Sequence, residues 1–311
     1  MDAPGWGMLK LLYLWCIHMT KKLLVGATFR DAHPDQVEWL DLQLKFLKAT
    51  TEDFDHVSFV NGRGSYSNRE NTDLGDISSF DAYPTKVIGI GEARTQRDPS
   101  PTSSQHIDAL NGLLAHFKSE RHNYDNFLFL DNDAFPVREG WLGDLTAKMD
   151  EWNRLIAVVV RPENLEIRWH ASILLAKPEG LDGLHFQLQH IPEGDFMSVD
   201  ELDVGIGAFQ DKLKDKVWPL IRTNRLNLHP VAYGIYFDMF YHHTFGAARH
   251  VRRGRNTHQP WDTLRWGRNN YATQYINPDY AWEQYNERLW QNPTGFISEL
   301  AGWCTERYAS F

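Results

Sequence analysis

The sequence predicts an α/β fold in which a mostly parallel central sheet is flanked by helices. Short apolar segments typical of strands alternate with amphipathic segments typical of helices. The strand-like segments are continuous apolar runs, which indicates strands buried on both faces, as in parallel sheets covered by helices. With 311 residues, of which 42% are hydrophobic, the chain can bury a large core, and a mainly disordered protein is excluded.

The predicted elements follow one another from residue 23. The first strand, 23–28, leads through a polar turn into a helix over 34–50, whose Leu40, Leu44 and Leu47 share one face. A helix over 104–119 precedes the most apolar strand. The remaining strands are predicted at 56–60, 86–90, 127–130, 155–160 and 171–176, and a polar surface loop at 63–83. Ligands bind at the carboxyl ends of parallel strands, so the loops after these strands should converge on one site.

The strongest motif is Asp131-Asn132-Asp133, which follows the apolar strand directly and precedes Ala-Phe-Pro. Two carboxylates at the end of a buried strand are costly to desolvate unless a cation lies between them. Hard divalent cations take oxygen ligands and can bridge carboxylates to a diphosphate. The alternative is a turn in which Asp and Asn cap the next helix. The position of the motif after four apolar residues favours a metal site.

In this motif the chain resembles the GT-A glycosyltransferases, enzymes with a Rossmann-like fold that use nucleotide sugars. The resemblance covers about residues 20 to 250. It implies Mn²⁺ or Mg²⁺ bound against the diphosphate of a donor, most readily a UDP-sugar. Asp133 would be the more direct metal ligand, and Asp131 would contact the metal through water or the donor ribose.

The same resemblance implies a set of donor-binding residues. They lie after the first strand, after the second strand, on the helix before the motif and in the motif itself. They are Thr28, Arg30, Asp31, Asn61, His106, Asn111, Asp131 and Asn132. For His106 and Asn111 an ordinary place on the helix surface is the alternative.

A third metal ligand is predicted near the end of the domain. The apolar stretch from Tyr233 suggests a strand that ends at His242-His243. Imidazole is a good ligand for Mn²⁺-type sites, and several GT-A enzymes complete their metal site with a late histidine. Successive strand residues point to opposite faces, so only one of the two should bind the metal. We predict His242; a purely structural histidine is the alternative.

The sequence signals for residues that bind or deprotonate the acceptor are weaker than those for the metal site. Asp203, and then Glu201, precede a predicted helix, where the GT-A resemblance would place a base that deprotonates the acceptor hydroxyl. Stabilisation of the helix dipole by acidic residues is the alternative. Trp169 and His170 precede a strand and are predicted to line the acceptor pocket, with core packing as the alternative for the tryptophan.

Three segments are expected: a leader or non-native extension (1–18), the GT-A catalytic domain (19–245), and a basic, aromatic, helical extension packed on that domain (246–311). Residues 247–268 include six arginines and one acidic residue, Asp262, although the whole chain has a net charge of −9. Arginines suit phosphate, so this stretch is predicted to contact the diphosphate or an anionic acceptor. A solvated charged face is the alternative. Trp261 and Trp266 there suit stacking on a base or sugar.

Composition sets further limits. No apolar run approaches the roughly 20 residues of a membrane-spanning helix. Only two cysteines occur, far apart in the chain, so neither a disulfide framework nor a cysteine zinc site is expected. The protein is therefore predicted to be cytoplasmic.

These patterns favour a metal-dependent glycosyltransferase that moves a sugar from a nucleoside-diphosphate sugar to an acceptor hydroxyl. A non-catalytic carbohydrate-binding protein would explain the many aromatic residues but not a metal site. A phosphoryl- or nucleotidyl-transfer enzyme could use the same carboxylates. However, Phe135 stands where dehalogenase-type phosphatases have Thr or Val, and Gly26-Ala27-Thr28 lacks the repeated glycines of a nucleotidyltransferase loop.

Overall fold

The computed structural model describes residues 22–30, 34–61, 84–90, 101–161, 168–191, 201–206, 213–226, 228, 233–243 and 282–302. The expectations for the leader, Asp31, the loop over 63–83 and the arginine-rich stretch with Trp261 and Trp266 lie outside these residues. All structural statements below concern the described residues.

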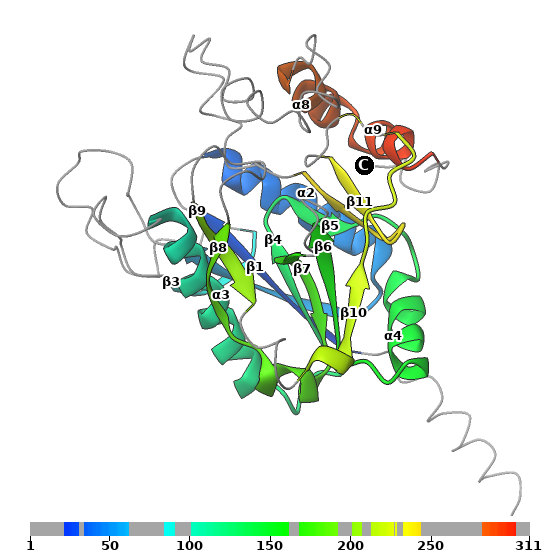
Figure 1. Ribbon diagram of the computed structural model, residues 1–311. Helices are drawn as coiled ribbons and strands as arrows, with labels where there is room; N and C mark the ends of the chain where they lie inside the picture. The colour runs from blue at the N-terminus through cyan, green and yellow to red at the C-terminus, as the bar shows by residue number, and fades with distance from the viewer. Residues whose placement is uncertain are drawn as a thin grey trace, which may run out of the picture.

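A seven-stranded sheet forms the centre of the molecule, with the strand order β10-β6-β7-β4-β1-β2-β3 (Figure 1). All neighbouring strands are parallel except β7, which is antiparallel to both β4 and β6. The predicted mostly parallel sheet is thus confirmed. Its strands are β1 (Leu23–Arg30), β2 (Phe54–Asn61), β3 (Lys86–Ile90), β4 (Asn126–Asp131), β6 (Ile156–Arg161), β7 (Arg168–Ala176) and β10 (Val217–Leu220).

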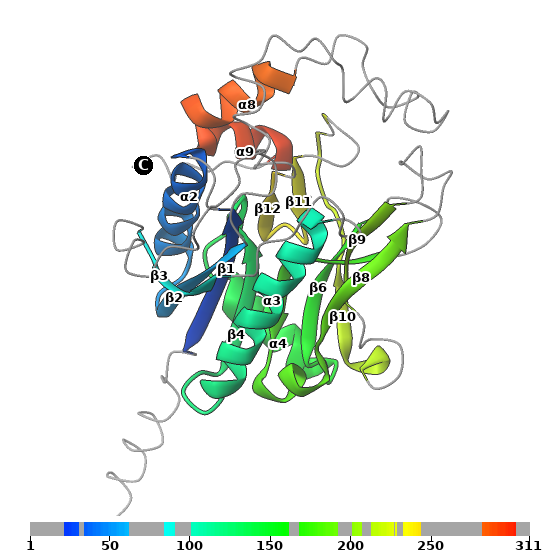
Figure 2. The ribbon, with the colours of Figure 1, turned by 90° about the vertical axis from the view of Figure 1, so that its left-hand side faces the viewer.

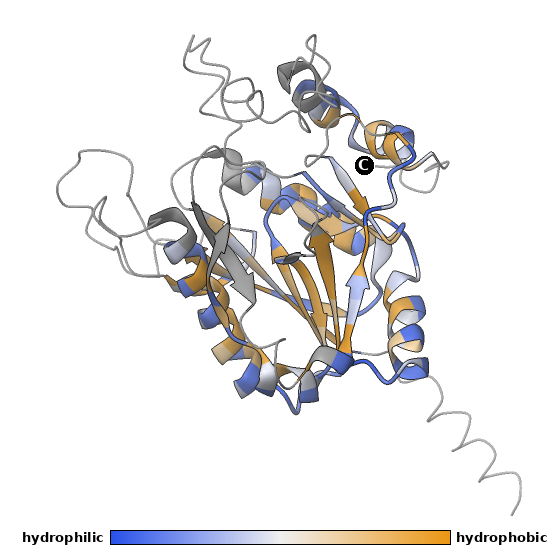
Figure 3. Ribbon diagram, in the orientation of Figure 1, coloured by the Kyte–Doolittle hydropathy of each residue, from blue (hydrophilic) through white to orange (hydrophobic). Residues whose placement is uncertain are grey.

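Helices cover both faces of this sheet. Helix α3 (Pro101–Ser119) packs on one face, and α2 (Pro34–Thr50) and α4 (Trp141–Glu151) pack on the other (Figure 2). Alternate residues of one strand enter different cores: Phe127 and Phe129 of β4 pack with α3, and Leu128 and Leu130 with α2 and α4. The central strands are therefore apolar throughout, whereas the helices are apolar on one side only (Figure 3).

Two smaller sheets complete the described strands. Strands β11 (Gly234–Tyr236), β12 (Phe240–His242) and β5 (Ala134–Pro136) form one antiparallel sheet in the order β11-β12-β5. Strands β8 (Phe186–Ile191) and β9 (Glu201–Ile206) form the other. Two short 3₁₀ helices lie at Pro178–Gly183 and Lys214–Lys216.

Two helices near the C-terminus, α8 (Trp282–Gln291) and α9 (Pro293–Ala301), pack beside α2 and the β11-β12-β5 sheet. Leu289, Phe296 and Leu300 share a buried cluster with Trp39 of α2 and Tyr241 of β12. The backbone N–H groups of residues 225 and 226 donate to the carbonyl of Leu300, at 2.9 and 3.0 Å.

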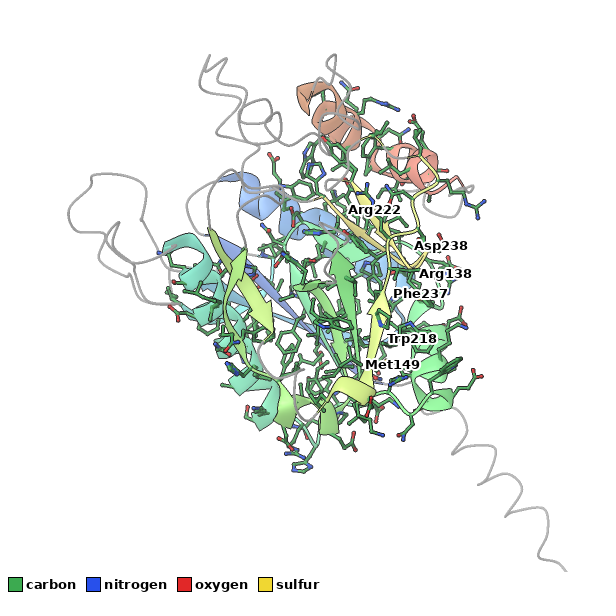
Figure 4. All side chains as sticks on the ribbon, in the orientation of Figure 1. Arg138, Met149, Trp218, Arg222, Phe237 and Asp238 are labelled. Atoms are coloured by element: carbon green, nitrogen blue, oxygen red, sulfur yellow. The ribbon has the colours of Figure 1, made fainter. Side chains whose placement is uncertain are left out.

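The structure corrects two predictions of secondary structure. Glu201 and Asp203 do not precede a helix: they belong to strand β9, where Asp203 pairs with Gln189 of β8. The stretch from Tyr233 to His243 is not one strand but a hairpin, because the chain reverses at Phe237 and Asp238. Both residues have a positive φ of 52°. Phe237 packs edge-on against Trp218 of β10 beside the hairpin, as Figure 4 shows.

Candidate metal centre

Asp131, Asp133 and His242 form a compact group that can hold a metal ion. One ligand atom from each residue lies within 4.8 Å of the others. Nε2 of His242 is 3.7 Å from Oδ2 of Asp131 and 3.5 Å from Oδ1 of Asp133. His242 and Asp133 are buried, while Asp131 is partly exposed. Two carboxylate oxygens and one imidazole nitrogen suit a divalent cation such as Mn²⁺ or Mg²⁺, although they do not distinguish between these metals.

The fold explains why these three residues meet. Asp131 ends β4, and the two-residue turn Asn132-Asp133 leads into β5. Strands β2 and β3 extend the sheet on one side of β1, and the chain then returns to form β4 on the other side of β1. The direction of the strand order therefore changes between β1 and β4, and α/β sheets bind ligands at such switch points. Strand β12 pairs with β5 so that His242 lies opposite Ala134. The backbone N–H of His243 donates to the carbonyl of Asp133 at 3.0 Å, which fixes the hairpin to the turn.

His106 lies beside the first carboxylate of the cluster. Its Nε2 is 2.9 Å from Oδ1 of Asp131 and 3.0 Å from the hydroxyl oxygen of Thr28. The other oxygen of Asp131, Oδ2, is the one nearest His242. Three residues predicted from separate segments, Thr28 of β1, His106 of α3 and Asp131 of β4, therefore meet at the carboxyl end of the sheet.

His242 and His243 face different surroundings, as the alternation along a strand requires. Nδ1 of His243 lies 2.7 Å from the hydroxyl of Tyr241, and its ring contacts Trp39 and Tyr233. Burial raises the pKa of Tyr241 well above its usual value, with Tyr233 and Asp133 adding to the effect, so the hydroxyl beside His243 stays protonated. His243 is thus part of the core, and His242 is the one in the cluster.

Two further predicted residues lie at this edge of the sheet. The ring of His170 on β7 has its centroid 6.0 Å from that of His242, and Nδ1 of His170 accepts a hydrogen bond from the backbone N–H of Ser172 at 3.1 Å. Asn61 ends β2, opposite Arg30 of β1. Its Oδ1 is buried and accepts no hydrogen bond from the described part of the chain. Their roles toward acceptor and donor stay predictions.

Three other predicted residues whose side chains the structure describes, Asn111, Trp169 and Asn132, have the following surroundings. Both polar atoms of the Asn111 side chain bond the backbone of Phe186: Nδ2 donates at 3.0 Å and Oδ1 accepts at 3.2 Å. Asn111 therefore holds β8 against α3, and its role toward a donor stays a prediction. Trp169 packs against the core on the α3 face, which is the alternative that we gave for it. Asn132 is buried within the turn.

Sequence analysis missed a buried polar group behind the metal turn. Gln43 of α2 donates from Nε2 to the carbonyls of Asp131 at 2.8 Å and Ala134 at 2.7 Å. Its Oε1 lies 3.0 Å from Nε2 of His56, whose Nδ1 lies 2.6 Å from the hydroxyl of Thr85. A signal was present, because residue 43 falls on the apolar face between Leu40 and Leu47, where a polar residue needs a buried partner.

No known protein-family model matches the chain, and no curated protein matches it. Among the described helices, none combines the length and apolar character needed to cross a membrane.

Proposed function

We propose that the protein is a metal-dependent glycosyltransferase that uses a nucleoside-diphosphate sugar. The observation that carries the proposal is the convergence of Asp131, Asp133 and His242 within 4.8 Å at the carboxyl edge of a mostly parallel sheet. In this reading Asp131, Asp133 and His242 would hold Mn²⁺ or Mg²⁺. When bound, the metal would supply positive charge that stabilises the departing diphosphate.

The residues of the chain have separate tasks in this proposal. The two carboxylates and the imidazole fix the position of the donor diphosphate. Nε2 of His106 lies beside Oδ1 of Asp131, and Oδ2 lies on the side of His242. Asn61, with its free carbonyl oxygen at the end of β2, lies at the same edge and suits a contact with the nucleoside. Glu201 and Asp203 remain the proposed acceptor-side acids, now on strand β9.

Binding of nucleotides with metal tests the proposal. We would titrate UDP, GDP and the corresponding UDP- and GDP-sugars into the protein with Mn²⁺ or with EDTA, by calorimetry, and then assay release of the diphosphate. Asp133→Asn removes one charged ligand with little change of shape. Asp144→Asn is the matched control, because Asp144 is exposed and pairs with Arg138 at 2.6 Å.

The proposal predicts Mn²⁺-dependent binding of at least one donor, weakened at least about 100-fold by Asp133→Asn and unchanged by Asp144→Asn. Release of a nucleoside diphosphate from a nucleotide sugar identifies a glycosyltransferase. Release of phosphate from UDP or GDP, or of sugar 1-phosphate from a nucleotide sugar, would instead identify phosphoryl or nucleotidyl transfer at the same carboxylates. Binding of free sugars without metal or nucleotide would identify a carbohydrate-binding protein and contradict the proposal.

A further inference from the structure

A chain of buried and partly buried polar side chains ends on the backbone of the turn between the two candidate metal carboxylates. Gln43 is fully buried, and its amide nitrogen reaches two carbonyls, those of Asp131 and Ala134. These two residues bracket the turn Asn132-Asp133. A single NH₂ group thus uses its two hydrogens to hold the two ends of the turn together.

The hydrogen bonds of this chain run in one direction. Since the Gln43 nitrogen faces two carbonyls, its oxygen must be the atom near His56, and Nε2 of His56 must donate to it. Burial lowers the pKa of His56 to about 3, so the ring is neutral at pH 7 and Nδ1 accepts from the Thr85 hydroxyl. The Ser58 hydroxyl donates to Thr85 at 3.3 Å. The orientation of the Gln43 amide is therefore set by neighbours on β2 and just before β3.

We propose that Gln43 and, acting through it, His56 are positioning residues for the metal centre: they hold the backbone on both sides of Asn132-Asp133 so that the two carboxylates converge with His242. The proposal rests on the metal centre of the proposed function. Gln43 binds backbone carbonyls of the turn, and His56 binds Gln43, so both act on the ligands through the turn backbone.

A merely structural polar group would satisfy buried atoms without affecting the turn. Here the carbonyls that Gln43 binds belong to one candidate ligand, Asp131, and to the residue after the other, Asp133. Without the amide, two buried carbonyls lose their donor, and the turn must rotate toward another donor to recover one. Such a rotation changes the separation of the carboxylates, so metal affinity falls in addition to stability.

Binding of Mn²⁺ alone tests this proposal without a donor or an activity. Free Mn²⁺ is measured from its electron paramagnetic resonance signal, and the melting temperature of each variant is measured without metal. Gln43→Met keeps the length of the side chain and removes both donors. Gln43→Asn keeps the amide, but it is too short to reach both carbonyls. It carries the same test should Gln43→Met not fold.

Thr50→Val is the matched control. Thr50 is buried near the end of the same helix, and its hydroxyl donates to the carbonyl of Phe46 at 2.8 Å, so the substitution costs stability without touching the metal turn. His56→Leu removes the donor to Gln43 and tests whether His56 acts through Gln43. Its effect on Mn²⁺ affinity should disappear when Gln43 is already Met.

We expect Gln43→Met or Gln43→Asn to weaken Mn²⁺ binding about 10-fold and Thr50→Val to leave it unchanged at a comparable loss of melting temperature. If wild type binds Mn²⁺ and the Gln43 variants bind it equally well, Gln43 is structural only and the inference is wrong, while the proposed function stands. Additive effects of His56→Leu and Gln43→Met would exclude the action of His56 through Gln43. If wild type binds no Mn²⁺, the proposed function fails as well.

Discussion

The candidate metal ligands lie on two segments, the β4-β5 turn and the β11-β12 hairpin, and these segments are held in different ways. The turn between β4 and β5, Asn132-Asp133, is tied at both ends by the buried side chain of Gln43. The turn between β11 and β12, Phe237-Asp238-Met239, is held in the described structure without such an amide bridge across its ends: the N–H of Phe237 donates to the carbonyl of Ile221 at 2.9 Å, and the N–H of Asp238 donates to the hydroxyl of Thr223 at 2.9 Å. Its own backbone closes it, with the N–H of Met239 donating to the carbonyl of Tyr236 at 3.0 Å.

The second turn has a conformational cost that the first does not. Phe237 and Asp238 both lie at a φ of 52°, in the left-handed region that favours Gly and Asn in two-residue hairpin turns. In return, the hairpin places β12 between β11 and β5, and His242 takes its position from strand pairing on both sides. The charged ligands thus depend on the side-chain amide of Gln43, and the imidazole depends on strand register and on hydrogen bonds between the hairpin and residues 221–223.

Among substitutions in the β11-β12 hairpin, that of His242 should weaken metal binding the most. His242→Gln should weaken Mn²⁺ binding at least about 10-fold, because an amide is a poorer ligand than imidazole. The loss should be smaller than that of Asp133→Asn, which removes a charge. The measurement is the same titration by electron paramagnetic resonance, and equal affinities of His242→Gln and wild type would remove His242 from the metal centre.

The first turn should lose its support in acid. The pKa of folded His56 is about 3, against about 6.5 in the unfolded chain, so between these pH values the unfolded state binds one proton more. Stability contributed by neutral His56 is present above pH 6.5 and is lost as the pH falls toward 3, by up to about 1.4 kcal/mol per pH unit. Urea unfolding from pH 4 to 7 should show a steeper slope for wild type than for His56→Gln; parallel slopes would contradict this account.

Relief of the strained second turn should have the smallest effect. Asp238→Gly removes the cost of a positive φ and also a carboxylate oxygen that is buried without a hydrogen bond in the described structure. We expect a melting temperature about 2 °C higher and unchanged Mn²⁺ affinity.

Gly140→Ala is the control for that prediction, because it adds a side chain at a positive φ, whereas Asp238→Gly removes one. The φ of Gly140 is 72°, and nothing lies within 4 Å of an added Cβ, so Gly140→Ala tests backbone strain alone. It should destabilise the protein by about 1 kcal/mol. A lower melting temperature for Asp238→Gly would show that the Asp238 side chain stabilises the turn, and that the turn is not held at a net cost.

The sequence predicted the parallel half of the fold well because periodicity and continuous apolar runs report local burial. The helix over 34–50 and the strand at 86–90 have the predicted bounds. Asp131 and Asp133 were recognisable because a carboxylate after a buried strand needs a partner. The hairpin was missed because its turn, Phe237-Asp238, lacks the Gly or Asn that usually marks such a turn.

Two other features depend on partners that are distant in the sequence. Acidic residues before Val204-Gly205 suggested the start of a helix, but β9 forms by pairing with β8, which periodicity alone did not reveal. The position of Gln43 on an apolar helix face was visible, whereas its partners Asp131 and Ala134 lie about 90 residues away. The roles of Arg30, Asp31, Asn61, Glu201 and Asp203 in donor or acceptor binding stay predictions.

The central claim is that Asp131, Asp133 and His242 together bind a divalent metal, and anomalous diffraction tests it most directly. Crystals grown with Mn²⁺ and UDP would be measured at the manganese absorption edge. The account predicts one strong peak about 2.0 to 2.3 Å from oxygens of Asp131 and Asp133 and from Nε2 of His242. A peak elsewhere, or none at this edge of the sheet under saturating Mn²⁺, would contradict it.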